Sequence, residues 1–234
     1  MLRIIDARTA EPVPAAPARR GPTRVEVHAP GHDTTGLRVL LVADLLVRAL
    51  ELDGTPAWPL LTGAEDRARL REDAAALGIR PFEDGRVGGA GQAVHVVCEG
   101  GAAPDGATVA VAPVTPAEQG PADPDALRLA LLERHHHARV ELGATALDEA
   151  RDTLARWRRA VAAWARQPSR PVPGEVRDRL RAAWEDDLDA PGVLRVLRDV
   201  ETDPGLPDGA RFETYAYADR FLGLELTRDL GSPV

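Results

Sequence analysis

The stretch GHDTTGLRVLLVADLLVRALELDG, residues 31–54, joins a short polar turn to a long apolar run. From Leu37 to Leu52 the apolar residues are dense and become amphipathic towards the end, which predicts a helix packed on a sheet. Gly54 follows as a C-cap signal. Thr23 to Ala29 alternates apolar and polar residues before the turn, which predicts a strand. The order strand, turn, helix predicts an α/β unit.

The segments on either side of this unit extend the pattern. We expect a strand at Leu2–Ile5, a surface helix at Gly63–Ile79 and two buried strands in AVHVVCE and ATVAVAP. Beyond a linker at Thr115–Asp125, the remaining segments carry helical periodicity. The predicted fold class is α/β plus all-α, a reduced Rossmann-like parallel-sheet domain (residues 1–121) followed by a helical bundle (residues 122–234).

The composition restricts the chemistry. All 29 basic residues are arginine, so no lysine can form a Schiff base or clamp a phosphate. The net charge of -8 argues against non-specific binding to nucleic acid or to acidic membranes. Cys98 is alone, so an internal disulfide cannot form. No apolar run has the length of a signal peptide or a membrane span, and we therefore expect a cytoplasmic protein.

Three segments of the second half resemble, in their order, the helical domain of class I cysteinyl-tRNA synthetases: DPDALRLALLERHHHARVEL, LDEARDTLARWRRAV and WEDDLDAPGVLRVL. They look still more similar to a relative, the mycothiol-pathway ligase that joins cysteine to glucosaminyl-inositol. In the first half, the strands up to the Asp33-Thr34-Thr35 turn and the AVHVVCE segment resemble that family more loosely. The family is considerably longer, so a large part of its catalytic domain has no counterpart here.

Two signature motifs of the family are missing. Its Asp-Thr-Thr turn leads into a His-X-Gly-His motif that stabilises the phosphates of ATP, whereas here the turn runs into Gly36-Leu37-Arg38. Its Lys-Met-Ser-Lys-Ser loop should precede DPDALRLALL, where this chain has TPAEQGPA. The resemblance therefore implies that cysteine adenylation by the family mechanism is lost.

The cysteine-sensing zinc of the family also lacks its ligands. Val27 stands at the first cysteine position, Cys98 stands at the second, and APVTPAE replaces the segment with the remaining ligands. One ligand of four does not make a zinc site, so we expect no metal and no cofactor. For Cys98 the expectation is a buried, unreactive thiol.

The run His135-His136-His137 suggests a metal site at first sight. We expect these residues to continue a helix, in which neighbouring side chains point about 100° apart and three in succession cannot converge on one ion. The family has a similar stretch facing its active site, so the resemblance implies that the run lines a pocket.

Other patterns have structural interpretations. We expect Asp189 to cap the helix that follows it, within an acidic turn between two helices. The remaining expectations are a helical core (Trp157, Trp164, Trp184), a solvated basic face (Arg156, Arg158, Arg159), an acidic turn without metal (Asp186, Asp187) and a glycine loop without phosphate (Gly88, Gly89, Gly91).

Three functional hypotheses follow. The chain is a degenerate paralogue that serves as a binding or interaction module, a repurposed enzyme or ligand binder with a remodelled pocket, or a helper subunit of a partner enzyme. We favour the first, a pseudoenzyme with no catalytic residues. We expect a protein partner or self-association through the α/β half and a small-molecule ligand, but neither tRNA nor a membrane. By resemblance, the ligand-binding residues are His32, Asp33, Thr34, Thr35, His95, His135 and His136.

Overall fold

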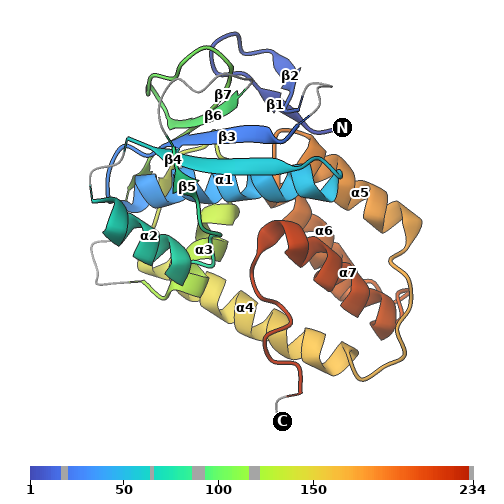
Figure 1. The fold of residues 1–234 in the computed structure, drawn as a ribbon. Coiled ribbons are helices and arrows are strands. Elements are labelled where there is room, and N and C mark those ends of the chain that lie inside the picture. Colours follow the sequence, from blue (N-terminus) through green and yellow to red (C-terminus); the bar gives the residue numbers. More distant parts are fainter. Residues whose placement is uncertain (17–20, 64–65, 86–92, 116–121, 232–234) are drawn as a thin grey trace.

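The computed structural model describes residues 1–16, 21–63, 66–85, 93–115 and 122–231. Strands dominate the first half of the chain and helices the second (Figure 1). This arrangement confirms the predicted fold class, a parallel-sheet α/β part followed by helices. In the part of the chain that the structure describes, no helix is both long enough and apolar enough to cross a bilayer.

A five-stranded sheet forms the centre of the first half. Its strands have the order β5-β4-β3-β6-β7, and every neighbouring pair is parallel. The predicted strands at 23–29, in AVHVVCE and in ATVAVAP are confirmed as β3, β6 and β7. The strands are β3 (Thr23–His28), β4 (Ala57–Thr62), β5 (Glu83–Asp84), β6 (Ala93–Cys98) and β7 (Ala107–Val111).

An antiparallel hairpin of β1 (Arg3–Ile5) and β2 (Pro12–Pro14) lies near the edge strand β7. Beyond β1, the N–H of Ala7 donates to the carbonyl of Thr108 at 2.8 Å, so this segment borders β7. Pairing with β1 gives the backbone of β2 its hydrogen-bond partners. Figure 1 shows α1 (Thr34–Leu52) on one side of β3 and β4 and the hairpin beyond β3, next to the end of α5 (Gly174–Glu185).

Helix α1 (Thr34–Leu52) lies along the sheet, as predicted. Asp33 caps its N-terminus by accepting a hydrogen bond from Gly36 N at 2.6 Å. Gly36 is required there, because a Cβ would lie 2.2 Å from the carbonyl oxygen of Gly31. The helix ends before Gly54, whose φ of +77° suits the residue after a C-cap. A second helix, α2 (Arg67–Ala76), packs against α1 and confirms the predicted surface helix.

The second half is the predicted bundle. Trp157 and Trp164 both contact Tyr215 edge to face, with ring centroids 5.7 and 5.1 Å away. All three tryptophans of this half are buried, which confirms their predicted place in the core. Asp189 caps its helix through Gly192 N at 2.8 Å, also as predicted. The helices are α3 (Pro124–Leu132), α4 (Ala144–Trp164), α5 (Gly174–Glu185), α6 (Ala190–Thr202) and α7 (Asp208–Leu222).

The two halves share contacts. A short parallel pair, β8 (Val114–Thr115) and β9 (Val140–Glu141), joins a strand from each half. Buried apolar residues of both halves belong to one continuous cluster. The predicted boundary at residues 121 and 122 falls at the edge of a segment outside the described residues, and the division into two domains stays a prediction.

Candidate functional site

The candidate site lies at the carboxyl ends of β3 and β6. The chain passes from β3 through α1 to β4, and then returns to β6 on the other side of β3. In open parallel sheets, ligands bind outside the carboxyl ends of the strands where the strand order reverses in this way. His28 ends β3, Cys98 ends β6, and α1 begins at Thr34. The topology therefore predicts a ligand position beside the N-terminus of α1.

A chain of hydrogen bonds links three strands at this place. The Thr62 hydroxyl donates to the Val27 carbonyl at 3.0 Å and lies 2.9 Å from Nδ1 of His28. Nε2 of His28 lies 3.0 Å from Nδ1 of His95. Because the hydroxyl proton is used on Val27, His28 must donate from Nδ1, and its neutral form accepts at Nε2 from His95. One network therefore joins β4, β3 and β6.

Glu26 completes this group on the same face of the sheet. Its Oε2 lies 3.5 Å from Nδ1 of His95, and its other oxygen pairs with Arg24. Burial lowers the pKa of His28, and His95 lowers it further, while Glu26 opposes them. Burial also lowers the pKa of His95, again against Glu26. The two imidazoles are neutral near pH 7, so they can pass a proton or bond a neutral ligand but offer no positive charge to a phosphate.

The side chains of the Asp-Thr-Thr turn form hydrogen bonds that stabilise the turn. Besides the cap formed by Asp33, the Thr35 hydroxyl accepts a hydrogen bond from Val114 N at 3.1 Å. Nε2 of His32 lies 2.6 Å from a carboxylate oxygen of Asp73 on α2. Thr34 is the first residue of α1. The structure thus places these four predicted residues at the carboxyl end of the sheet, and the side chains of His32, Asp33 and Thr35 contact other parts of the protein.

Arg38 lies in the part of α1 where the resembled family has its phosphate-stabilising histidines. Its side chain is 1% exposed and donates to four backbone carbonyls. The acceptors lie at 2.8 Å (Ala112), 2.7 Å (Ala138), 3.4 Å (Arg134) and 2.8 Å (His135). Burial lowers its pKa to about 10, so it stays charged at neutral pH. The guanidinium binds the turn after α3 and is not presented to solvent.

The histidine run contradicts the helix that the sequence predicts. Helix α3 ends at Leu132, and residues 135–137 lie in a turn. The physical reason is that Arg38 takes the carbonyls of this segment and Ala112 N donates to the carbonyl of His136 at 2.8 Å, so the intrahelical bonds do not continue. Contrary to our prediction, the three side chains can therefore converge.

In this turn the three imidazoles point at one carboxylate oxygen. The Nε2 atoms lie 3.8 Å (His135), 3.7 Å (His136) and 2.7 Å (His137) from Oδ2 of Asp187. The other oxygen of Asp187 accepts a hydrogen bond from Ile5 N at 2.8 Å. The predicted residues His135 and His136 thus form a second group, separate from the group around His28.

The zinc site of the resembled family does not fit this structure. Val27 is fully buried, and Cys98 is a partly buried free thiol. Among the described residues, Cys98 joins no group of three or more metal-ligating side chains. Gly88, Gly89 and Gly91 lie outside the described residues, as does most of the segment that stands where the lysine loop should be.

Sequence reasoning missed Glu26, His28 and Thr62 in the first group, and His137 and Asp187 as partners in the second. Alternation in β3 would have placed Glu26 and His28 on one face of the sheet. Thr62 and His95 reach Glu26 and His28 through the register of β4 and β6 against β3. No local sequence pattern indicates that register.

Comparison with known proteins finds curated L-cysteine:1D-myo-inositol 2-amino-2-deoxy-alpha-D-glucopyranoside ligases. The protein from Acidothermus cellulolyticus is 44% identical over 110 residues, which are 45% of this chain and 25% of that protein. The one from Parafrankia sp. is 53% identical over 76 residues, 32% of this chain and 16% of that protein. The one from Streptosporangium roseum is 42% identical over 113 residues, 45% and 26% of the two chains.

These findings confirm the resemblance to mycothiol cysteine ligases, which are related to class I cysteinyl-tRNA synthetases. The matched residues span about a quarter or less of the length of these relatives. No family model matches the chain.

Proposed function

We propose that this chain is a catalytically degenerate relative of the cysteine ligases, which acts as a binding or interaction module and does not adenylate cysteine. One observation carries the proposal. The stretch of α1 that follows Thr35, where the resembled family has its phosphate-stabilising histidines, here consists of Gly36, Leu37, Arg38 and Val39, and all four are buried. Its single cation, Arg38, is already bonded to backbone carbonyls.

Two further features support the loss of adenylation. No lysine is available for a phosphate clamp anywhere in the sequence. Burial lowers the pKa values of His28 and His95 at the carboxyl end of the sheet, so these two imidazoles offer no positive charge to the phosphates of ATP at neutral pH. Each phosphate or oxyanion clamp of this kind contributes about a hundredfold to a thousandfold in rate. Without the histidine motif and without the lysine loop, we expect no measurable adenylation of cysteine.

The test is cysteine-dependent exchange between ATP and pyrophosphate, with the full chain at micromolar concentration and an active ligase relative assayed in parallel. We expect exchange at the level of a blank without protein, while the relative exchanges readily. Thermal shift with ATP, AMP and cysteine, separately, then asks whether the chain binds any of these compounds. Exchange clearly above the blank would overturn the proposal.

We further propose that the module makes its contacts through the α/β half, with a second copy or another protein. The support is the edge of the sheet beyond β4. Strand β5 pairs only with Leu60 and Leu61, so Ala57, Trp58 and Pro59, which pair with β3 on their inner side, have no described strand on their outer side. The Trp58 side chain there is one of the few large apolar groups that the described residues expose. Exposed aromatic side chains of this kind are enriched in protein interfaces.

A further inference from the structure

The turn after α3 and the turn after α5 bring four metal-ligating side chains together. Each of His135, His136, His137 and Asp187 offers one ligand atom, and these atoms all lie within 4.8 Å of one another. The residues come from segments about 50 positions apart in the sequence. None of them belongs to the strands that carry Val27 and Cys98, so the cluster is distinct from the zinc position of the resembled family.

The three imidazoles differ in their hydrogen bonds. Nε2 of His137 lies 2.7 Å from Oδ2 of Asp187. His136 is 5% exposed, and neither its Nδ1 nor its Nε2 has a hydrogen-bond partner among the described residues. Buried imidazole nitrogens without a partner are rare in folded proteins, because such a group loses its water without compensation. The side chain of His136 therefore points to a group that binds there.

The carboxylate is held in place for this contact. Asp187 N donates to the carbonyl of Arg3 at 2.9 Å, and Oδ1 accepts from Ile5 N, which leaves Oδ2 directed at the imidazoles. Asp187 and Leu188 both adopt left-handed backbone conformations, with φ of 53° and 59°. A ligating carboxylate that is oriented by its second oxygen is a common feature of metal sites.

The protonation state also suits ligation. Burial lowers the pKa of His136 well below its ordinary value, and the neighbouring His135, His137 and Arg38 lower it further. Burial likewise lowers the pKa of His135, against the charge of Asp187. A metal ion binds the neutral imidazole, so these side chains need not lose a proton near pH 7.

We propose that His135, His136, His137 and Asp187 form a site for one dication of the zinc class, with the three Nε2 atoms and Oδ2 as ligands. Nitrogen-rich donor sets with one carboxylate select zinc, cobalt or nickel over magnesium or calcium. In a tetrahedral zinc site the ligand atoms are about 3.3 Å apart. The separations of 3.7 and 3.8 Å from Oδ2 are close to this value, and the His137 contact would lengthen.

The second histidine group is a weaker candidate for the same ion. Glu26, His28 and His95 also place their ligand atoms within 4.8 Å. Both nitrogens of His28, however, are already bonded, to Thr62 and to His95. The unpartnered nitrogens of His136 distinguish the cluster in the turn.

The test uses the full chain with any purification tag removed, stripped with a chelator and dialysed. We expect zinc titration by calorimetry to give one site per chain, cobalt to give the absorption bands of a tetrahedral complex, and zinc to raise the melting temperature. In Asp187→Asn and in His137→Gln, affinity should fall about tenfold or more. His137 is partly exposed, so its variant should fold even if the Asp187 variant does not.

The matched controls are His32→Gln, which changes an exposed histidine paired with Asp73, and His95→Gln in the other group. Both should bind zinc as the wild type does. The proposal is overturned if the wild type binds no zinc, if binding survives in both cluster variants, or if His95→Gln abolishes it. Absence of binding would mean that a buried water, not a metal ion, satisfies His136.

Discussion

At the scale of single residues, Asp44 in the middle of α1 is a buried carboxylate with three arginine partners. It is 1% exposed and pairs with Arg48 Nε and Arg80 Nε at 2.8 Å each and with Arg128 Nη2 at 3.2 Å. Burial alone would raise the pKa of Asp44, but the charges and hydrogen bonds of the three arginines outweigh it, and the pKa is lowered. One carboxylate thus joins α1 to α3 and to the segment after α2.

We predict that Asp44→Asn destabilises the chain by about 3–5 kcal/mol, because it leaves the buried Arg128 without its counter-charge. Urea unfolding at pH 7 followed by circular dichroism measures the effect. The matched control is Asp178→Asn on α5, where the side chain is exposed, and it should change the free energy of unfolding by less than about 0.5 kcal/mol. Equal losses in both variants would show that the pairs with Asp44 contribute nothing specific.

The same network has a pH dependence with a definite sign. Since the pKa of Asp44 is lower in the folded chain than in the unfolded chain, its contribution is present above the unfolded value of about 3.9. This contribution is lost as the pH falls through the pKa of Asp44 in the folded chain. The difference between wild type and Asp44→Asn should therefore shrink in acid, which the same unfolding experiment measures.

At the scale of elements, the sheet combines a covered edge with an open one. The N-terminal segment borders β7, whereas β4 is only partly covered by the two residues of β5. Unpaired strand edges favour association with another chain. Pro59 has no N–H to donate, which limits pairing at one position, but Trp58 beside it is 41% exposed.

We predict self-association through this edge, with sedimentation at micromolar concentrations showing more than monomer. Trp58→Glu should weaken it about thirtyfold, the loss expected for an aromatic residue central to an interface. Leu230→Glu is the control, because Leu230 is equally exposed at 42% but lies after α7. A wild type that stays monomeric, or a control that dissociates as much as Trp58→Glu, would contradict the contact.

Local patterns predicted the main elements of the fold. The alternation in residues 23–29 and the apolar density of residues 37–52 follow the periods of a strand and of a helix with one face in the protein core. Both patterns are local, so β3 and α1 could be predicted from the sequence. The end of α3 could not, because it depends on Arg38, 97 positions before the carbonyl of His135 that it binds. The contact between His28 and His95, 67 positions apart, similarly depends on strand register.

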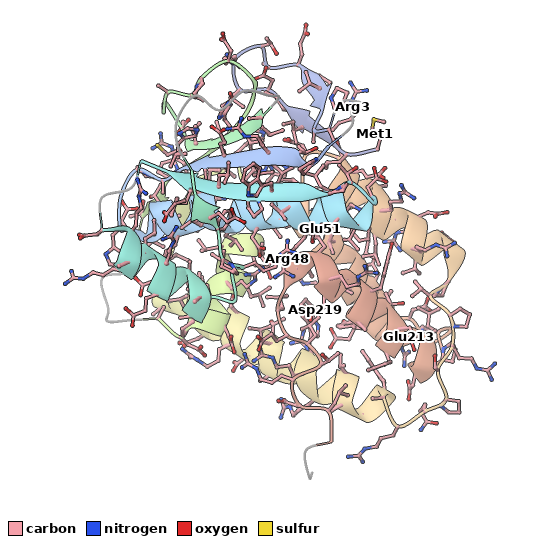
Figure 2. The ribbon with its side chains drawn as sticks, in the orientation of Figure 1. Met1, Arg3, Arg48, Glu51, Glu213 and Asp219 are labelled. Atoms are coloured by element: carbon pink, nitrogen blue, oxygen red, sulfur yellow. The ribbon has the colours of Figure 1, made fainter. Side chains whose placement is uncertain are left out.

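At the scale of the whole molecule, the sheet half and the helical half are joined at several places. Arg128 of α3 binds Asp44 of α1 and the carbonyl of Leu77, and Arg48 of α1 donates to the carbonyl of Arg220 on α7 at 3.2 Å. Figure 2 shows Arg48 and Asp219 in the region between α1 and α7, and Met1 and Arg3 beside α5. These contacts involve several elements of both halves, which favours a single cooperative unit.

We therefore predict that the two halves unfold together. The chain has one cysteine, Cys98 in β6, so its reaction with a thiol reagent reports on the sheet half. Fluorescence of the buried Trp157, Trp164 and Trp184 reports on the helical half, and a Trp58→Phe background removes the remaining tryptophan.

In urea, the midpoints of thiol exposure and of fluorescence should coincide, since a two-state chain loses all its contacts in one transition. Asp44→Asn should shift both midpoints by the same amount, because Asp44 lies in α1 and its partner Arg128 in α3. If Cys98 became reactive at a clearly lower urea concentration than the fluorescence change, the sheet half would open by itself. The division at residues 121 and 122 would then correspond to two independent folding units.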